Sequence, residues 1–121
     1  MHPVQLRIET RVEGGVAVAA VRGEFDIYAK REFSALVTNI QHVAPTGALL
    51  VCLGEVAFAD STALGLLIAA AKRAQARDGR IALLGVPEQF AKVIRVTGLT
   101  ELLPAFETAA AAWAYLADGE E

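Results

Sequence analysis

Three side chains that carry oxygen stand together in the middle of the chain, at Asp60, Ser61 and Thr62. They lie between a continuous apolar run over residues 48–53, typical of a strand buried on both faces, and a longer segment with helical spacing. Such side chains cap helices, because their oxygens accept hydrogen bonds from the unpaired N–H groups of the first turn. A phosphate added to a hydroxyl here would lie at the positive end of the helix dipole. The group therefore predicts a helix cap, a phosphorylation site, or both.

A second carboxylate, Asp26, follows another predicted strand. Because parallel strands end at the same edge of a sheet, Asp26 and Asp60 are expected near each other. One hypothesis is an acidic pair that orients the Ser61 hydroxyl or the nucleotide of a kinase. The other is that each carboxylate caps its own helix, and this interpretation is preferred for Asp26. Two carboxylates without a histidine or a third acid make a poor metal site, so neither a metal nor another cofactor is expected.

The elements that position these residues follow a simple order. Residues 4–12 alternate apolar and polar side chains, and a Gly-Gly turn joins them to a second strand, which predicts an antiparallel hairpin. After Gly23, helices and strands alternate, which is typical of a parallel sheet with right-handed crossovers. The sequence thus predicts one α/β domain over residues 1–121, with a mixed, mostly parallel sheet, about four helices and a frayed tail at 118–121. Strands are expected at 4–12, 16–21, 48–53, 80–86 and within 99–106, and residues 54–57 are expected to leave the sheet.

Composition and charge exclude several functions. No apolar run approaches the roughly 20 residues of a membrane helix, and the N-terminus lacks a signal-peptide core, so a cytoplasmic protein without membrane insertion is expected. The single cysteine, Cys52, reads as a small buried hydrophobe. The net charge is −3 with both signs interspersed, which argues against nucleic-acid binding. No P-loop and no nucleophile–histidine spacing is present, so no catalytic residue is predicted.

A protein-docking face is predicted on the long helix. On a helical projection, four residues fall on the side away from the apolar positions 64, 67, 68 and 71. A surface of small apolar residues with one arginine suits contact with another protein. The alternative interpretation is that the alanines only raise helix propensity. The four residues are Leu66, Ala69, Ala70 and Arg73.

Residues 60–65, Asp-Ser-Thr-Ala-Leu-Gly, resemble the Asp-Ser-Ser/Thr-Gly-Leu-Gly signature of the STAS family of bacterial anti-sigma factor antagonists. The resemblance covers nearly the whole chain, because residues 23–26, 77–81 and 96–99 also resemble family landmarks in the same order. Two departures stand out. Ala63 replaces the usual glycine, and residues 28–30, Tyr-Ala-Lys, replace a small residue and proline. Both bear on the choice of partner more than on the fold.

The resemblance implies a switch. Family members are phosphorylated on the residue after the signature aspartate, which makes Ser61 the predicted acceptor and Thr62 the alternative. The unmodified domain would bind an anti-sigma factor serine/threonine kinase and so free a sigma factor. The kinase, using Mg-ATP, would then phosphorylate Ser61. A serine phosphatase would remove the phosphate again. Such partner switching regulates transcription in stress responses and sporulation, and the domain itself would not be an enzyme. The predicted flanking residues are Asp26, Asp60, Ala63, Leu64 and Gly65.

Two other functions are compatible with the sequence. The chain could be the STAS subunit of a lipid-transport ABC complex, in which the signature hydroxyl need not be phosphorylated. It could also be a small enzyme or nucleotide binder of flavodoxin-like shape. The lack of a second polar cluster near Ser61 argues against this last hypothesis.

Overall fold

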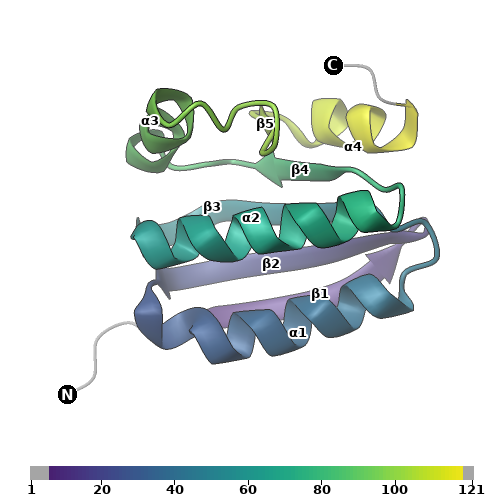
Figure 1. The fold of residues 1–121 in the computed structure, drawn as a ribbon, viewed down its shortest axis with the longest axis horizontal. Helices are drawn as coiled ribbons and strands as arrows, with labels where there is room; N and C mark the ends of the chain where they lie inside the picture. Colours follow the sequence, from purple (N-terminus) through teal and green to yellow (C-terminus); the bar gives the residue numbers. More distant parts are fainter. Residues whose placement is uncertain (1–5, 119–121) are drawn as a thin grey trace.

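Five strands form one sheet in the order in which they occur in the chain (Figure 1). The computed structural model describes residues 6–118. The first two strands are antiparallel, and every later neighbour is parallel, as predicted. The strands are β1 (Arg7–Glu13), β2 (Val16–Phe25), β3 (Leu49–Ala59), β4 (Ile81–Leu84) and β5 (Ala105–Phe106).

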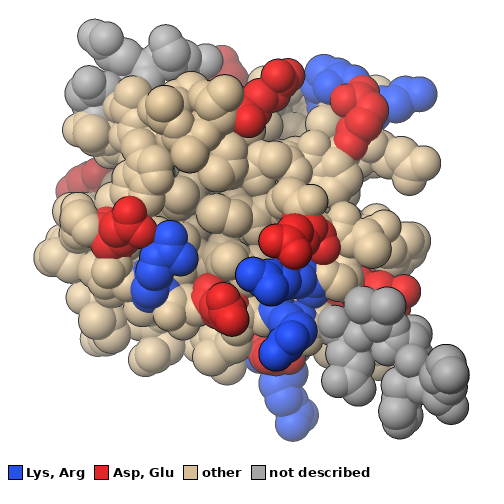
Figure 2. All heavy atoms as spheres, turned by 180° about the vertical axis from the view of Figure 1, so that it is seen from behind, with Lys and Arg blue, Asp and Glu red and all other residues tan. Residues whose placement is uncertain are grey.

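More helices pack on one face of the sheet than on the other. The helical elements are the 3₁₀ turn η1 (Ile27–Ala29), α1 (Lys30–Val43), α2 (Ser61–Ala76), α3 (Glu88–Val96) and α4 (Ala109–Asp118). The main core cluster joins residues of α1, α2 and α3 to one face of the sheet, and a smaller cluster joins α4 to the other face. From behind, Figure 2 shows acidic and basic side chains interspersed on the face opposite α1 and α2. None of the described helices is long and apolar enough to cross a membrane.

Alternation along the central strands explains both core clusters. In β2, Ala17 and Ala19 join the main cluster, whereas Val16 and Val18 join the cluster under α4. Successive side chains of a strand point to opposite faces, so a strand covered on both sides must be apolar at every position. The continuous apolar runs in the sequence are therefore the part of the sheet that lies between two helix layers.

The third strand is longer than predicted. Residues 54–57 were expected to leave the sheet, but β3 continues to Ala59, so that prediction is wrong. The physical reason is that β2 also continues, to Phe25, and pairs with β3 through two register shifts as far as the Phe25–Ala59 pair. Two other expectations concern residues that lie partly outside the described range. Residues 4 and 5 of the first predicted strand and residues 119–121 of the predicted tail lie outside it. Asp118, which was also predicted to belong to the tail, is instead the last residue of α4, because the helix continues to it.

Candidate functional site

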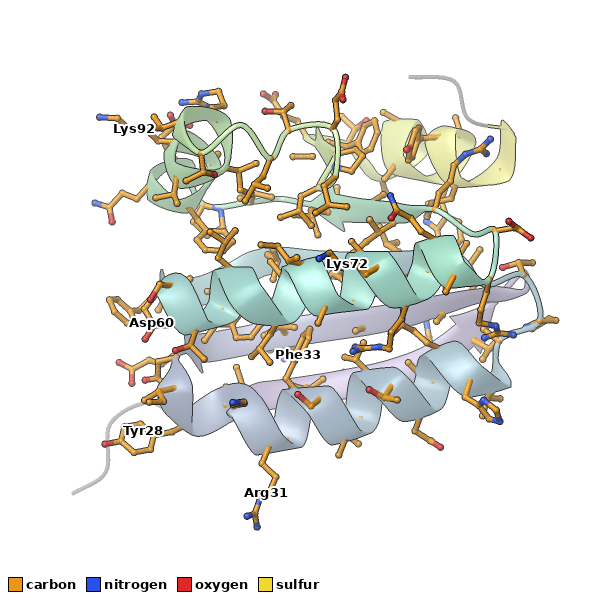
Figure 3. The ribbon with its side chains drawn as sticks, in the orientation of Figure 1. Tyr28, Arg31, Phe33, Asp60, Lys72 and Lys92 are labelled. Atoms are coloured by element: carbon orange, nitrogen blue, oxygen red, sulfur yellow. The ribbon has the colours of Figure 1, made fainter. Side chains whose placement is uncertain are left out.

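Ser61 is the first residue of α2, and its side chain is exposed. Only Asp60, which is labelled in Figure 3, separates it from the end of β3, so Ser61 lies at the carboxyl edge of the sheet. Asp60 caps the helix, because its Oδ1 accepts hydrogen bonds from the backbone N–H groups of Thr62 at 2.9 Å and Ala63 at 3.3 Å. The predicted helix cap is confirmed. Thr62 is half-buried, which makes it the less accessible of the two hydroxyls.

The cap changes what the helix end offers to a phosphate. The sequence suggested free N–H groups in the first turn, but Asp60 already occupies those of Thr62 and Ala63. The next donor, the N–H of Leu64, bonds to the Asp60 carbonyl at 3.3 Å. Among the hydrogen bonds of the described residues, only the N–H of Ser61 itself has no partner in this turn. The N–H groups that could bind a phosphate on Ser61 are therefore already hydrogen-bonded, apart from that of Ser61 itself.

Asp26 occupies the equivalent position on the neighbouring strand. Its Oδ1 accepts a hydrogen bond from the N–H of Tyr28 at 3.0 Å, which caps η1. The N–H of Asp60 bonds to the carbonyl of Phe25 at 3.3 Å, so the two aspartates follow adjacent strand ends. The interpretation of Asp26 as a cap is confirmed. The placement of both carboxylates at one edge also makes the surroundings of Ser61 acidic.

The predicted docking face on α2 is partly wrong. Leu66 is 8% exposed and Ala70 is fully buried, whereas Ala69 is exposed and Arg73 is half-buried. The reason is that α2 contacts both the sheet and α1, so its buried stripe is wider than a helix lying on a sheet alone would need. The buried residues of α2 are Ala63, Leu66, Leu67, Ala70, Ala71 and Ala74.

Arg73 belongs to a network between α1 and α2 that centres on Gln41, a residue the sequence did not single out. Arg73 Nε donates to Gln41 Oε1 at 2.8 Å, and Gln41 Nε2 donates to the carbonyl of Ala70 at 3.0 Å. The guanidinium of Arg77 donates to the carbonyls of Gln41 and Ala44. Burial lowers the pKa of Arg73 from its ordinary value. The one available signal was the position of Gln41, four residues after the apolar Val37 and so on the same side of a helix, since buried polar groups need partners.

Exposed apolar side chains lie at the end of the molecule that carries Ser61. Ile27 is 62%, Tyr28 91% and Phe58 52% exposed, and we call these three residues the apolar rim. Tyr28 and Asp60 lie at the same end of the molecule in Figure 3, and η1 contacts α2. Figure 1 places α3, with the exposed Val93 and Val96, at this end as well. Sequence reasoning flagged residue 28 as unusual but did not predict this surface.

The remaining candidate group, Cys52, lies away from Ser61. It is half-buried beside the core cluster under α4, so the expectation of a buried small hydrophobe is met only in part. Burial raises the pKa of the Cys52 thiol, which keeps it protonated at neutral pH. This is the setting of a structural thiol and does not suit a nucleophile.

The sequence profile of the STAS domain matches residues 7–112. This chain belongs to the STAS domain family. It is 30% identical over 100 residues to the anti-sigma-B factor antagonist of Staphylococcus aureus, an alignment that covers 83% of this chain and 92% of that protein. The equivalent protein of Staphylococcus epidermidis is also 30% identical over 100 residues. The family suggested by the 60–65 signature is thus confirmed.

Solved structures of other proteins share the fold. An anti-sigma factor antagonist from Mycobacterium paratuberculosis superposes with a TM-score of 0.83 at 22% identity, covering 94% of this chain and 96% of that chain. The phosphorylated form of the Bacillus cell fate determinant SpoIIAA superposes with a TM-score of 0.69 at 21% identity, covering 88% and 96%. The predicted STAS-like architecture is confirmed. The names of these relatives lend no support to a subunit of a lipid-transport complex.

Proposed function

We propose that this STAS domain is an anti-sigma factor antagonist that binds an anti-sigma factor at the carboxyl edge of its sheet and is switched by phosphorylation of Ser61. The observation that carries the proposal is the exposed Ser61 hydroxyl, which the Asp60 cap holds at the start of α2, at the end of the molecule that also carries the apolar rim. The name of the Staphylococcus aureus relative, anti-sigma-B factor antagonist, agrees with it. In this function the domain binds a protein and is itself a substrate, without catalysing a reaction.

The apolar rim supplies the docking contacts. Large apolar side chains that are exposed on a monomer mark surfaces for protein partners, and aromatic residues contribute most at such interfaces. Tyr28 and Phe58 are the aromatic members of the rim, and Ala69 extends the surface along α2. Leu66 and Ala70 support this surface from inside the core, and Arg73 supports it by joining α2 to α1.

The partner in this proposal is an anti-sigma factor that is also a serine/threonine kinase and uses Mg-ATP. It would bind the unmodified domain, release its sigma factor, and later phosphorylate Ser61, with Thr62 as the alternative acceptor. A serine phosphatase would reset the switch. All of these partners belong to the cytoplasm.

A phosphate at Ser61 would act on the partner more than on the fold. It adds a charge of about −1.5 to −2 at neutral pH. Asp60 fills the adjacent N–H donors, and Asp26 lies on the neighbouring strand end, so the protein offers the new charge little compensation. The phosphate would lie in the interface with the partner, and removing its charge from water there costs several kcal/mol. A hundredfold loss of affinity needs only about 2.7 kcal/mol.

The proposal is tested with the anti-sigma factor kinases encoded in the same genome. Incubated with its cognate kinase and ATP, the wild-type domain should gain one phosphate, and Ser61→Ala should gain none. Ser61→Ala should still bind the kinase and release the sigma factor, because it removes only the acceptor. Thr62→Ala is the matched control and should still be phosphorylated. A phosphopeptide that maps to Thr62 or elsewhere, with Ser61 unmodified, would refute the assignment.

A further inference from the structure

Positive charge is concentrated on the two central helices. Residues 30–43 and 61–77, which form α1 and α2 with the C-cap of α2, contain five basic residues and one acidic residue, a net charge of +4. The rest of the chain contains six basic and thirteen acidic residues, a net charge of −7, so that the whole chain carries −3. The five basic residues are Lys30, Arg31, Lys72, Arg73 and Arg77, and the acidic one is Glu32.

This positive charge is not neutralised within the described residues. The three ion pairs in this part of the chain lie within β1, between β2 and β3, and within α3. Arg73 and Arg77 donate hydrogen bonds only to uncharged amide and carbonyl oxygens at the end of α1, and the other three basic residues are exposed. Burial lowers the pKa of Arg73, so its surroundings disfavour the charge that it carries.

The five basic residues share one layer of the molecule because α1 and α2 run side by side. Both helices begin at the carboxyl edge, after the parallel strands β2 and β3, and they contact each other. Figure 3 shows Lys72 extending from the middle of α2 and Arg31 extending from α1. We call the outer surface of α1 and α2, with these five residues, the basic face.

The basic face adjoins Ser61. α2 starts at Ser61, and Lys72 lies about three turns further along it, a distance of about 17 Å. Lys30 directly follows η1, which contacts α2. A standard protein interface buries about 800 Å² on each partner, which corresponds to a disc about 32 Å across. A partner that covers Ser61 and extends along the helices therefore reaches Lys30 and Lys72.

From this placement of charge we propose that the anti-sigma factor presents an acidic surface to the basic face. The inference rests on the proposed function and specifies the chemistry of its partner. Opposite charges across an interface accelerate association and favour the correct partner. The acidic groups would also supply the counter-charge that Arg73 lacks among the described residues. Because Asp26 and Asp60 make the carboxyl edge itself acidic, we expect the acidic groups of the partner to lie over the helices.

The direction of the proposed switch agrees with an acidic partner. A basic surface would bind phosphoserine more tightly than serine, because arginine and lysine pair with phosphate. Phosphorylation would then strengthen the complex. An acidic surface repels the added charge instead, so that phosphorylation of Ser61 lowers the affinity.

Two other anionic partners fit the basic face less well. A lipid surface binds helices that combine basic residues with large apolar ones, but Val43 is the only large exposed hydrophobic residue of α1 and α2 among those described. A nucleic acid carries negative charge along its whole length and would be repelled by the net charge of −7 on the rest of the chain.

The experiment measures the affinity of the unmodified domain for its cognate anti-sigma factor by isothermal titration calorimetry. Ala69 is exposed on α2 between Ser61 and Lys72, so a charge of either sign can be placed there. Ala69→Glu should bind roughly tenfold or more weakly than Ala69→Lys. Lys72→Glu should weaken binding more than Lys72→Gln, because it adds repulsion to the lost attraction. Added salt should weaken binding of the wild type more steeply than binding of Lys72→Glu.

Arg7→Glu is the matched control. It makes the same change of charge on the opposite face of the sheet, because the neighbouring Ile8 packs against the main core cluster and side chains alternate along a strand. Its affinity should stay within about threefold of wild type. Circular dichroism reports whether each variant is folded.

Each possible result decides the question. Tighter binding by Ala69→Glu than by Ala69→Lys would show a basic partner surface and overturn the inference. Wild-type affinity in both Lys72 variants would overturn it too, while leaving the proposed function intact. A wild-type domain that does not bind the anti-sigma factor would overturn the proposed function and this inference with it. Binding to phosphatidylglycerol vesicles or duplex DNA that only Lys72→Glu abolishes, with unchanged affinity for the anti-sigma factor, would assign the basic face to that ligand instead.

Discussion

At the scale of single residues, Asp60 determines what Ser61 can do. Its carboxylate holds two first-turn N–H groups, fixes the start of α2, and places a negative charge next to the hydroxyl. The sequence predicted this cap from the residue types alone, because aspartate before a helix has few other uses. It did not predict that only the N–H of Ser61 itself is left without a partner in the first turn, because that depends on the distances between atoms.

The cap makes a measurable contribution to stability. Asp60→Ala removes the acceptor of two N–H groups and should lower the free energy of unfolding by about 1 kcal/mol. Urea denaturation measures this as a lower midpoint with an unchanged slope. Asp26→Ala is the matched control and should cost less, because Asp26 caps a three-residue turn through one bond. Equal losses in the two variants would contradict this assignment.

At the scale of elements, α2 shows where sequence reasoning succeeds and where it fails. The order of strands and helices and the N-terminal hairpin were predicted, because glycine turns and apolar periodicity mark them directly. The inward face of α2 was predicted only in part, because residues 63–71 are nearly all small or apolar and give little directional contrast. The full length of β3 was also missed, since Gly54 and Glu55 do not look like strand residues.

Two adjacent alanines of α2 test the corrected face. Ala69 is exposed, whereas Ala70 is fully buried and its carbonyl accepts from Gln41. Ala69→Glu should change the free energy of unfolding by less than about 0.5 kcal/mol. Ala70→Glu buries an unpaired charge and should cost at least about 3 kcal/mol, or prevent folding. Thermal unfolding followed by circular dichroism compares them. Similar melting temperatures for the two variants would contradict the assignment of faces.

At the scale of the whole molecule, the two ends of the domain differ. Ile27, Tyr28, Phe58, Val93 and Val96 gather at the end that carries Ser61, and only Val12 and Val43 are large exposed hydrophobic residues elsewhere among those described. No periodicity marks this end, because it is assembled from three segments distant in the chain. The family signature located Ser61, but only the fold shows which apolar side chains share its end of the molecule.

Tyr28 tests whether the rim binds the partner. Tyr28→Ala removes a side chain that is 91% exposed, so stability should change little, whereas affinity for the anti-sigma factor should fall roughly tenfold or more. Isothermal titration calorimetry measures the affinity. Val43→Ala is the control, because Val43 is 58% exposed at the opposite end of α1. If both variants bound like wild type, the partner would have to dock elsewhere.

The central claim is that phosphorylation of Ser61 ends binding locally, through charge at the interface, and not by changing the fold. The most direct measurement compares backbone amide NMR shifts of the phosphorylated and unmodified domain, alongside the affinity of each for the anti-sigma factor. We predict large shifts confined to the start of α2 and the adjacent ends of β2 and β3, together with at least a hundredfold loss of affinity. Shifts spread through β4, β5 and α4, or full binding by the phosphorylated domain, would contradict the claim.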